Sequence, residues 1–362
     1  MIYEGRIPSL DGLRGIAAIA VVGFHYNIFF LPQARLPFVG RGYLAVDFFF
    51  LLSGFVLAHV YGRELASDWR SHWQKFAMAR FARIYPLFAL TTIVMATIHL
   101  SGAPLRLVLF SGRSLMLQPF LLQQWSGLSW NYPSWSISTE AEAYVFFVIF
   151  AGLLVKGKHP GLIGVCGVVI LTTLCITKDG DLNLYSGIPA LLRTLVEFSF
   201  GVLLYRAHSN YKGFAAGWVG ILAILFFGLA MKTKLDFLAL GAFASLIYYS
   251  VNATDGFARL LNSRPSVALG NWSYSIYLWH APIQYAVMVV FAASGYPVSN
   301  LNVSSARLLA LATILVVVRL SAYSYRSFEA PARRFLTQSL TRTSSGVLTP
   351  MQTDQMNRYP LR

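Results

Sequence analysis

Residues 48–61, FFFLLSGFVLAHVY, are apolar on every side rather than at alternating positions, and residues 308–318, LLALATILVVV, show the same pattern. Strands of a membrane barrel alternate polar and apolar residues over about ten positions, so both stretches indicate transmembrane helices. A helix needs roughly 20 apolar residues to cross about 30 Å of hydrocarbon. Stretches of that length recur along the chain, and we predict ten spans, at residues 10–31, 43–61, 84–101, 137–155, 160–177, 188–206, 213–231, 235–253, 272–294 and 305–326.

The composition supports an all-α, polytopic integral membrane helix bundle. The chain has 362 residues, of which 56% are hydrophobic and 12% are charged, and its mean hydropathy is +0.57. This is more apolar surface than one soluble core could bury. The net charge of +15 comes from basic residues scattered through short loops, which argues against a nucleic-acid partner and predicts, by the positive-inside rule, that both termini are cytoplasmic.

Two regions lie outside the regular spans. Residues 102–136 are too apolar for a solvated loop and too broken for a span, which favours a re-entrant or interfacial segment. We predict a membrane domain over residues 1–335 and a short, basic, disordered cytoplasmic tail over 336–362, which is rich in Ser and Thr. Cys166 and Cys175 share one span and indicate neither a disulfide framework nor a metal site.

The first span, SLDGLRGIAAIAVVGFHY (residues 9–26), contains two ionisable residues that membrane solvation does not explain. Arg14 and His25 are eleven residues apart, which places them on one stripe of a helix and about 16 Å apart along its axis. Ionisable groups inside a bilayer are costly and mark functional sites by default. His25 is our candidate general base, with a helix-packing histidine as the alternative. Arg14 could bind an anion or extend to the lipid headgroups.

A histidine base needs a group that orients its ring, and a carboxylate is the usual one. Asp47, Glu140 and Glu142 are the available carboxylates, and the sequence does not choose among them. Glu140 and Glu142 are about 200° apart around a helix, so at most one of them should face the cavity that holds His25. The alternative for each is a structural ion pair.

Further candidates lie on three other helices. Arg80 and Arg83, in ARFARIYP (79–86), share a helix face at the predicted cytoplasmic surface and suit a phosphate group, although positive-inside topology alone would also place them there. Ser53 and Gly54 permit close approach of a ligand or of another helix. In GNWSYSIYLWHAP (270–282), Tyr277 shares a stripe with Tyr274 and His280.

In their order and spacing, these motifs resemble the membrane-bound acyltransferase family 3, whose members O-acylate polysaccharides, lipid-linked sugars and related glycosides. The resemblance also rests on GYLAVDFFFLLSGF (42–55), WSISTEAEAY (135–144) and YRSFEAPARRF (325–335), which contains Glu329. The family's Arg-x10-His motif falls on Arg14 and His25, and its Arg-x-x-Arg motif on Arg80 and Arg83. The resemblance implies a ten-helix bundle that transfers an acyl group from cytoplasmic acyl-CoA to a sugar hydroxyl without a metal. Some members carry an added extracytoplasmic domain, and we expect a stand-alone transferase here.

The leading hypothesis is therefore a membrane O-acyltransferase that uses acyl-CoA, most simply acetyl-CoA, in a bacterial inner membrane. The phosphates of coenzyme A would bind Arg14, Arg80 and Arg83, and the site would be completed by Ser53, Tyr277 and His280. The expected partners are a saccharide or glycolipid acceptor, membrane lipid and machinery for polysaccharide synthesis or export. The rival hypotheses are a secondary transporter or flippase that uses the same polar residues, and a structural partner in an export complex.

Overall fold

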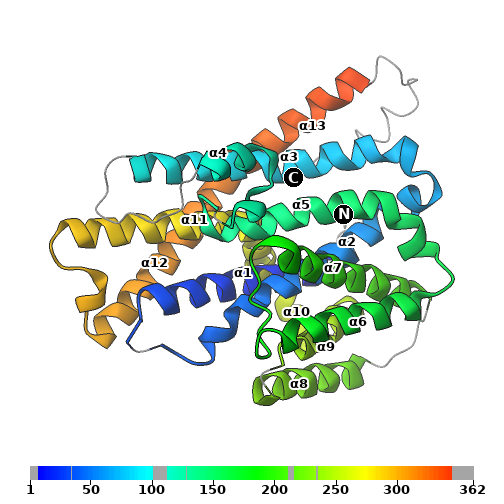
Figure 1. Cartoon of the computed structure of the whole chain (residues 1–362), viewed down its shortest axis with the longest axis horizontal. Helices are drawn as coiled ribbons and strands as arrows, with labels where there is room; N and C mark the ends of the chain where they lie inside the picture. The colour runs from blue at the N-terminus through cyan, green and yellow to red at the C-terminus, as the bar shows by residue number, and fades with distance from the viewer. Residues whose placement is uncertain are drawn as a thin grey trace.

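The computed structural model describes residues 7–33, 35–100, 112–127, 129–210, 216–233 and 235–344. Helices connected by short loops account for these ranges, which contain no β-strand, and the predicted all-α class is confirmed (Figure 1). The α-helices are α1 (Pro8–Phe29), α2 (Ala45–Ser67), α3 (Trp69–Leu100), α4 (Gly112–Leu117), α5 (Trp135–Ala151), α6 (Pro160–Ile176), α7 (Gly187–Asn210), α8 (Ala216–Thr233), α9 (Leu238–Asn252), α10 (Gly256–Leu261), α11 (Arg264–Ala293), α12 (Val303–Ser324) and α13 (Ala330–Ser344).

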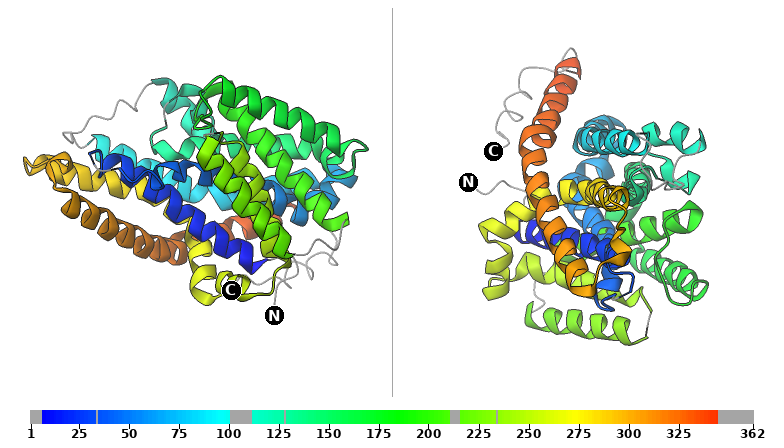
Figure 2. Two further views of the ribbon diagram at one scale, coloured as in Figure 1. Left: turned by 90° about the horizontal axis from the view of Figure 1, so that it is seen from below. Right: turned by 90° about the vertical axis from the view of Figure 1, so that its left-hand side faces the viewer.

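Shorter helical turns join these helices. The 3₁₀ turns are η1 (Val39–Leu44), η2 (Gln118–Phe120), η3 (Gln123–Ser126), η4 (Tyr132–Ser134) and η6 (Val298–Asn300). Two turns are π-helical: η5 (Gly152–Lys156) follows α5, and η7 (Tyr325–Glu329) connects α12 to α13. The right-hand view of Figure 2 shows α12 and α13, in orange and red, as one long rod on a side of the bundle.

Every predicted span coincides with a helix, but not every helix is long. Seven helical segments in the described ranges are long and apolar enough to cross a membrane; they contain α1, α2, α3, α5, α7, α11 and α12. The other three predicted spans fall on α6, α8 and α9, whose apolar stretches are shorter. The count of ten spans and the side on which the termini lie therefore remain predictions.

Helix ends are where the sequence prediction errs most. The predicted span 84–101 belongs to α3, which already begins at Trp69. The first part, WRSHWQKFAMAR (69–80), lies before the predicted span and forms a regular helix continuous with it. The predicted disordered tail is also helical at its start, since α13 ends at Ser344, and its remainder, 345–362, lies outside the described residues.

The segment between α3 and α5 consists of short helices. Its described part, 112–127 and 129–134, contains α4 and the turns η2, η3 and η4, whereas 102–111 and 128 lie outside the described residues. Gln118, Gln123 and Gln124 are buried here, and Gln123 donates to the carbonyl of Ser134 at 2.7 Å. Its buried glutamines attach this segment to the start of α5, while Leu115, Met116 and Phe120 are exposed.

Two helix pairs form the centre of the bundle: α1 packs chiefly on α11, and α2 on α7. The second pair is in direct backbone contact. A Cβ atom on Gly54 would lie 2.0 Å from the carbonyl oxygen of Phe198, and one on Gly201 would lie 1.9 Å from that of Leu51. Glycine is therefore required at both positions, which supports helix packing as the role of Gly54.

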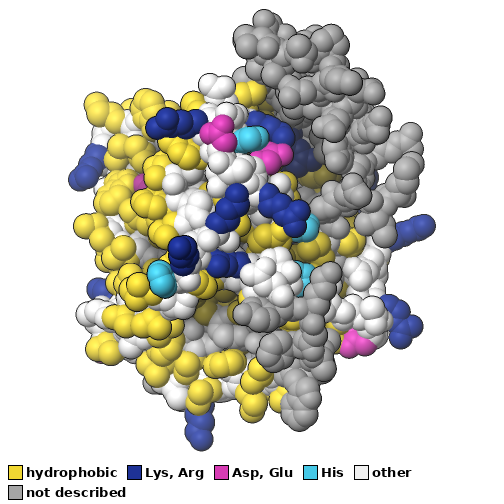
Figure 3. Space-filling model, turned by 90° about the vertical axis from the view of Figure 1, so that its right-hand side faces the viewer, with side chains coloured by type: hydrophobic (Ala, Val, Ile, Leu, Met, Phe, Trp, Pro, Cys, Tyr) yellow, Lys and Arg dark blue, Asp and Glu magenta, His cyan; other side chains and the backbone are white. Residues whose placement is uncertain are grey.

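Basic side chains collect at one end of the molecule. Figure 3 views this end, which carries the α2–α3 and α5–α6 connections, and shows many more Lys and Arg side chains than acidic ones. The exposed basic residues of these connections are Arg63, Arg70, Lys75, Lys156 and Lys158. A positive end next to apolar helices is what the positive-inside rule associates with a cytoplasmic surface.

Candidate active site

A cavity of about 160 Å³ lies among α1, α2, α3, α5 and α11. Six of the ten predicted site residues line it, and each helix contributes at least one of them. They are Arg14, Ser53, Arg80, Arg83, Glu140 and Tyr277. The remaining wall includes Phe49, Tyr144 and Tyr274, so charged groups meet an otherwise aromatic and aliphatic surface.

Three guanidinium groups reach this cavity from two helices, that of Arg14 from α1 and those of Arg80 and Arg83 from α3. Arg14 donates to Asp11 at 2.7 Å and to the carbonyl of Gly270 at 3.2 Å, which ties α1 to α11. Arg83 pairs with Glu329 and lies over the ring of Tyr274.

Arg80 is held differently. Its guanidinium lies over the ring of Tyr61 and donates to the hydroxyl of that residue at 3.4 Å. Its Nε is buried and has no hydrogen-bond partner among the described residues. A buried donor without a partner is costly, and an anionic ligand would satisfy it. Within the described ranges, no group of three or more His, Cys, Asp or Glu side chains is placed to hold a metal ion.

The two glutamates of α5 face different surroundings, as their spacing predicts. Glu140 is on the cavity wall, where it accepts hydrogen bonds from Ser53 at 2.9 Å and from Tyr144 at 2.7 Å. Glu142 accepts from the indole nitrogen of Trp125 at 2.5 Å and from Gln124 at 3.2 Å. Glu142 therefore fastens the segment before α5 and is not part of the cavity wall.

His25 is half-buried, and its nearest polar partner is another histidine. Its Nδ1 is 3.1 Å from the carbonyl oxygen of Val21 and 3.1 Å from Nε2 of His280, and the planes of the two imidazole rings are inclined by 24° with their centroids 5.0 Å apart. The ring of Tyr132 meets His25 edge-on at 4.9 Å between centroids. The prediction that Asp47, Glu140 or Glu142 orients His25 is wrong for the described residues, because each of these carboxylates is bonded elsewhere.

The two histidines are not on the cavity wall, and Tyr277 separates them from it. Its ring centroid is 5.9 Å from that of His280, and its hydroxyl is 2.6 Å from Ser136 Oγ and 2.8 Å from the carbonyl oxygen of Pro133. Of the two ionisable residues that share a stripe of α1, Arg14 thus lines the cavity and His25 does not. The histidine pair lies directly behind the wall, one aromatic ring away.

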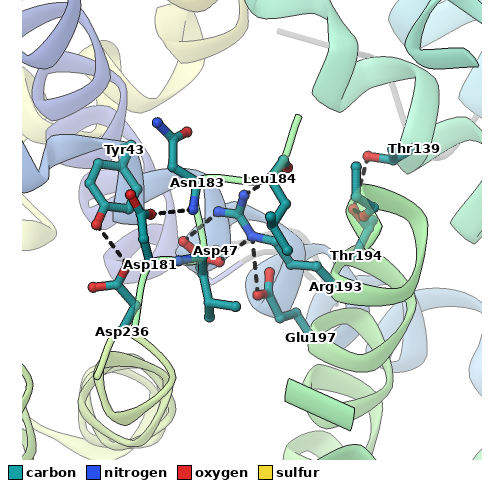
Figure 4. Close-up of polar contacts among 12 residues, drawn as sticks. Tyr43, Asp47, Thr139, Asp181, Asn183, Leu184, Arg193, Thr194, Glu197 and Asp236 are labelled. Carbon is teal, nitrogen blue, oxygen red and sulfur yellow. Dashed lines mark hydrogen bonds and ion pairs between the residues drawn. The ribbon is translucent and has the colours of Figure 1, made fainter. Parts of the chain in front are cut away.

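Asp47 belongs to a separate buried ion cluster that the sequence did not predict. Arg193 donates to both carboxylate oxygens of Asp47 at 2.7 Å and lies 3.5 Å from Glu197. Figure 4 shows Arg193 between these two carboxylates, with a further bond to the carbonyl of Leu184. All three charged side chains are essentially inaccessible. The available signal was the i, i+4 spacing of Arg193 and Glu197 inside a predicted span.

Glu329 is a second residue whose role the sequence did not reveal. Besides pairing with Arg83, it accepts a hydrogen bond from the hydroxyl of Ser275 at 2.6 Å. It is buried at the end of η7, and its signal in the sequence was an acidic residue in the otherwise basic motif YRSFEAPARRF. Glu329 therefore orients Arg83, one of the arginines that line the cavity, from the side facing away from it.

Known proteins of similar sequence identify the family of this chain. The chain is 26% identical over 369 residues to "O-acetyltransferase OatA" of Staphylococcus aureus, a match that covers 92% of this chain and 58% of that protein. It is 23% identical over 364 residues to "Peptidoglycan O-acetyltransferase OatA" of Listeria monocytogenes, and this match covers 91% of this chain and 56% of that protein. A shorter match, 38% identical over 153 residues, covers 37% of this chain and 77% of "Protein 2 in picA locus" of Rhizobium radiobacter. No solved structure matches. The model of the acyltransferase domain matches residues 7–322, and the chain thus belongs to acyltransferase family 3.

Proposed function

We propose that this protein transfers an acyl group, most simply acetyl, from cytoplasmic acyl-CoA to a hydroxyl of a sugar in a polysaccharide or lipid-linked saccharide. The family and the OatA relatives support O-acyl transfer in a membrane. The observation that carries the choice of donor is the meeting of Arg14, Arg80 and Arg83 on one cavity wall. Guanidinium groups bind phosphates through paired hydrogen bonds, and coenzyme A carries several phosphates.

In this proposal the donor enters from the basic end of Figure 3. Its phosphates bind the wall arginines, with Arg80 Nε as an open donor, and its thioester is directed toward Tyr277. The apolar wall accommodates the pantetheine arm. The same surface would interact with anionic lipid of the cytoplasmic leaflet of a bacterial inner membrane.

His25 then acts as general base on the acceptor. Its free ring nitrogen takes the proton of the sugar hydroxyl as the hydroxyl oxygen attacks the thioester carbonyl. The C–S bond breaks, the proton passes to the departing sulfur, and free coenzyme A thiol and an O-acyl sugar result. Tyr277 or Ser53 would donate to the oxyanion, although both hydroxyls have other partners at rest.

The test is thiol release by the purified protein in lipid nanodiscs, supplied with acetyl-CoA and a panel of glycan and glycolipid acceptors. We expect acceptor-dependent release that His25→Gln reduces by about 10²- to 10⁴-fold. Absence of release and of acetyl-CoA binding, together with gradient-driven movement of a glycolipid, would contradict the proposal and support a transporter. A stoichiometric burst of thiol release without any acceptor would instead indicate an acyl-enzyme intermediate, such as acyl-His25.

A further inference from the structure

His25 and His280 form a chain of hydrogen bonds between two backbone carbonyl groups. The carbonyl of Tyr277 lies 2.6 Å from His280 Nδ1, and Nε2 of the same ring lies 3.1 Å from His25 Nδ1. The carbonyl of Val21 lies 3.1 Å from that same His25 nitrogen. Because a carbonyl oxygen only accepts, the two ends of this chain determine where its protons are.

The first proton is on His280. Its Nδ1 must carry hydrogen to bond the carbonyl of Tyr277, so in the neutral ring Nε2 carries a lone pair. The ring cannot change this state by moving, because His280 is fully buried and its own carbonyl accepts from the hydroxyl of Tyr26 at 3.1 Å. This bond fixes the position of α11 against α1 at the level of His25.

The position of the second proton, on the ring of His25, follows from that of the first, and two contacts of His25 Nδ1 give the same answer. His25 Nδ1 must donate to the lone pair on His280 Nε2, and it must also carry hydrogen to face the carbonyl of Val21. A doubly protonated His280 would direct an N–H at an N–H. The neutral pair therefore has a single consistent arrangement, in which Nε2 of His25 is unprotonated.

We infer that His280 is the positioning residue of the proposed base, which it holds in the tautomer that leaves Nε2 of His25 free to accept a proton. The role that a carboxylate has in many enzymes is taken here by a neutral imidazole. When His25 gains a proton on Nε2, its Nδ1–H still donates to His280, and the new charge is stabilised without a permanent charge beside it. His25 retains accessible surface although its neighbours Phe24 and Tyr26 are buried, and the inference requires that an acceptor hydroxyl reach Nε2 through it.

This inference rests on the proposed function for its kinetic consequences, but the tautomer can be observed without any activity. Nitrogen-15 NMR of the histidine-labelled protein in nanodiscs distinguishes protonated from unprotonated ring nitrogens, and His25→Gln identifies the signals of residue 25. We expect His25 with hydrogen on Nδ1 and none on Nε2. Hydrogen on Nε2 in the wild-type protein would overturn the inference, whatever the protein catalyses.

Two substitutions then separate positioning from packing. His280→Asn keeps a donor near the carbonyl of Tyr277 and removes the acceptor that faces His25, whereas His280→Gln can place an amide oxygen where Nε2 was. We expect His280→Asn to lower kcat about 100-fold with KM for acetyl-CoA within about twofold, and His280→Gln to recover roughly tenfold of that loss. The Asn variant leaves the carbonyl of Val21 as the remaining partner of His25 Nδ1, so we expect the signal of the single tautomer to weaken in that variant and to persist in His280→Gln.

The matched control is His59→Asn, since His59 is a half-buried histidine of α2 outside this chain of bonds, and it should leave kcat unchanged. An unchanged kcat in His280→Asn, or an effect on KM alone, would overturn the positioning role. A wild-type protein with the expected tautomer but no acyl transfer to any acceptor would refute the proposed function and leave the tautomer assignment standing.

Discussion

Arg83 and Glu329 are 246 residues apart in the sequence, and they form an ion pair in which the arginine faces the cavity and the glutamate is buried behind it. The hydroxyl of Ser275 donates to the other oxygen of this carboxylate, so the position of Glu329 is fixed on two sides. The guanidinium group is therefore already oriented before an anion enters, which lowers the entropic cost of binding.

Glu329→Gln should weaken donor binding. The amide keeps the shape of the side chain but removes the charge that holds Arg83, and we expect KM for acetyl-CoA to rise about tenfold, equivalent to roughly 1.4 kcal/mol. Steady-state thiol release measures this. The control is Glu64→Gln, which breaks an exposed ion pair with Lys75 and should have no effect on KM. Equal KM values in Glu329→Gln and the wild type would refute the orienting role.

The two glutamates of α5 offer a second comparison. Glu140→Gln changes the charge of the cavity wall and its bonds to Ser53 and Tyr144, and we expect a fall in kcat/KM of about tenfold. Glu142→Gln changes only the attachment to Trp125 and Gln124, so kcat/KM should stay within about twofold of the wild type. The assignment fails if Glu142→Gln has the larger effect on kcat/KM.

The three members of the Asp47–Arg193–Glu197 cluster should contribute unequally to the stability of the protein. Arg193→Met leaves two buried carboxylates without a cation, and we expect a loss of roughly 3–5 kcal/mol in the free energy of unfolding. Asp47→Asn should lower the free energy of unfolding by a smaller amount, because Glu197 still neutralises Arg193. Thermal unfolding in one detergent compares the two variants. Equal losses would mean that Glu197 does not share the charge of Arg193.

The contact of α2 with α7 makes Gly54 intolerant of any side chain. Gly54→Ala places a methyl group 2.0 Å from the carbonyl of Phe198, so the helices must separate, and we expect a loss of roughly 1–3 kcal/mol. Gly164→Ala in α6 is the control, because its Cβ would meet nothing within 4 Å, and it should be neutral or slightly stabilising. Similar melting temperatures for the two variants would contradict the close packing.

The sequence predicts features that depend on one helix at a time. The eleven-residue spacing of Arg14 and His25, the opposite faces of Glu140 and Glu142, and the apolar length of each span all follow from 3.6 residues per turn. For this reason the helix class and six residues of the cavity wall could be predicted.

Pairing between helices could not be predicted from the same information. His25 meets His280 across 255 positions because Tyr26 bonds the backbone of α11 and because Arg14 reaches the carbonyl of Gly270. No local pattern encodes such a register. The prediction therefore chose a carboxylate for His25 by analogy with other enzymes, and Asp47 was assigned to the site although Arg193 had already neutralised it.

The π-helical turn η7 has one consequence for how this chain tolerates changes of length. A turn with i to i+5 hydrogen bonds contains one more residue than an α-helix has at that place, so the side chains after it are rotated by about 100°. Glu329 closes that turn. Deletion of a single residue from 325–328 would restore an unbroken α-helix and would direct a neighbour of Glu329 at Arg83. The donor site is thus sensitive to the number of residues in this turn as well as to their identity.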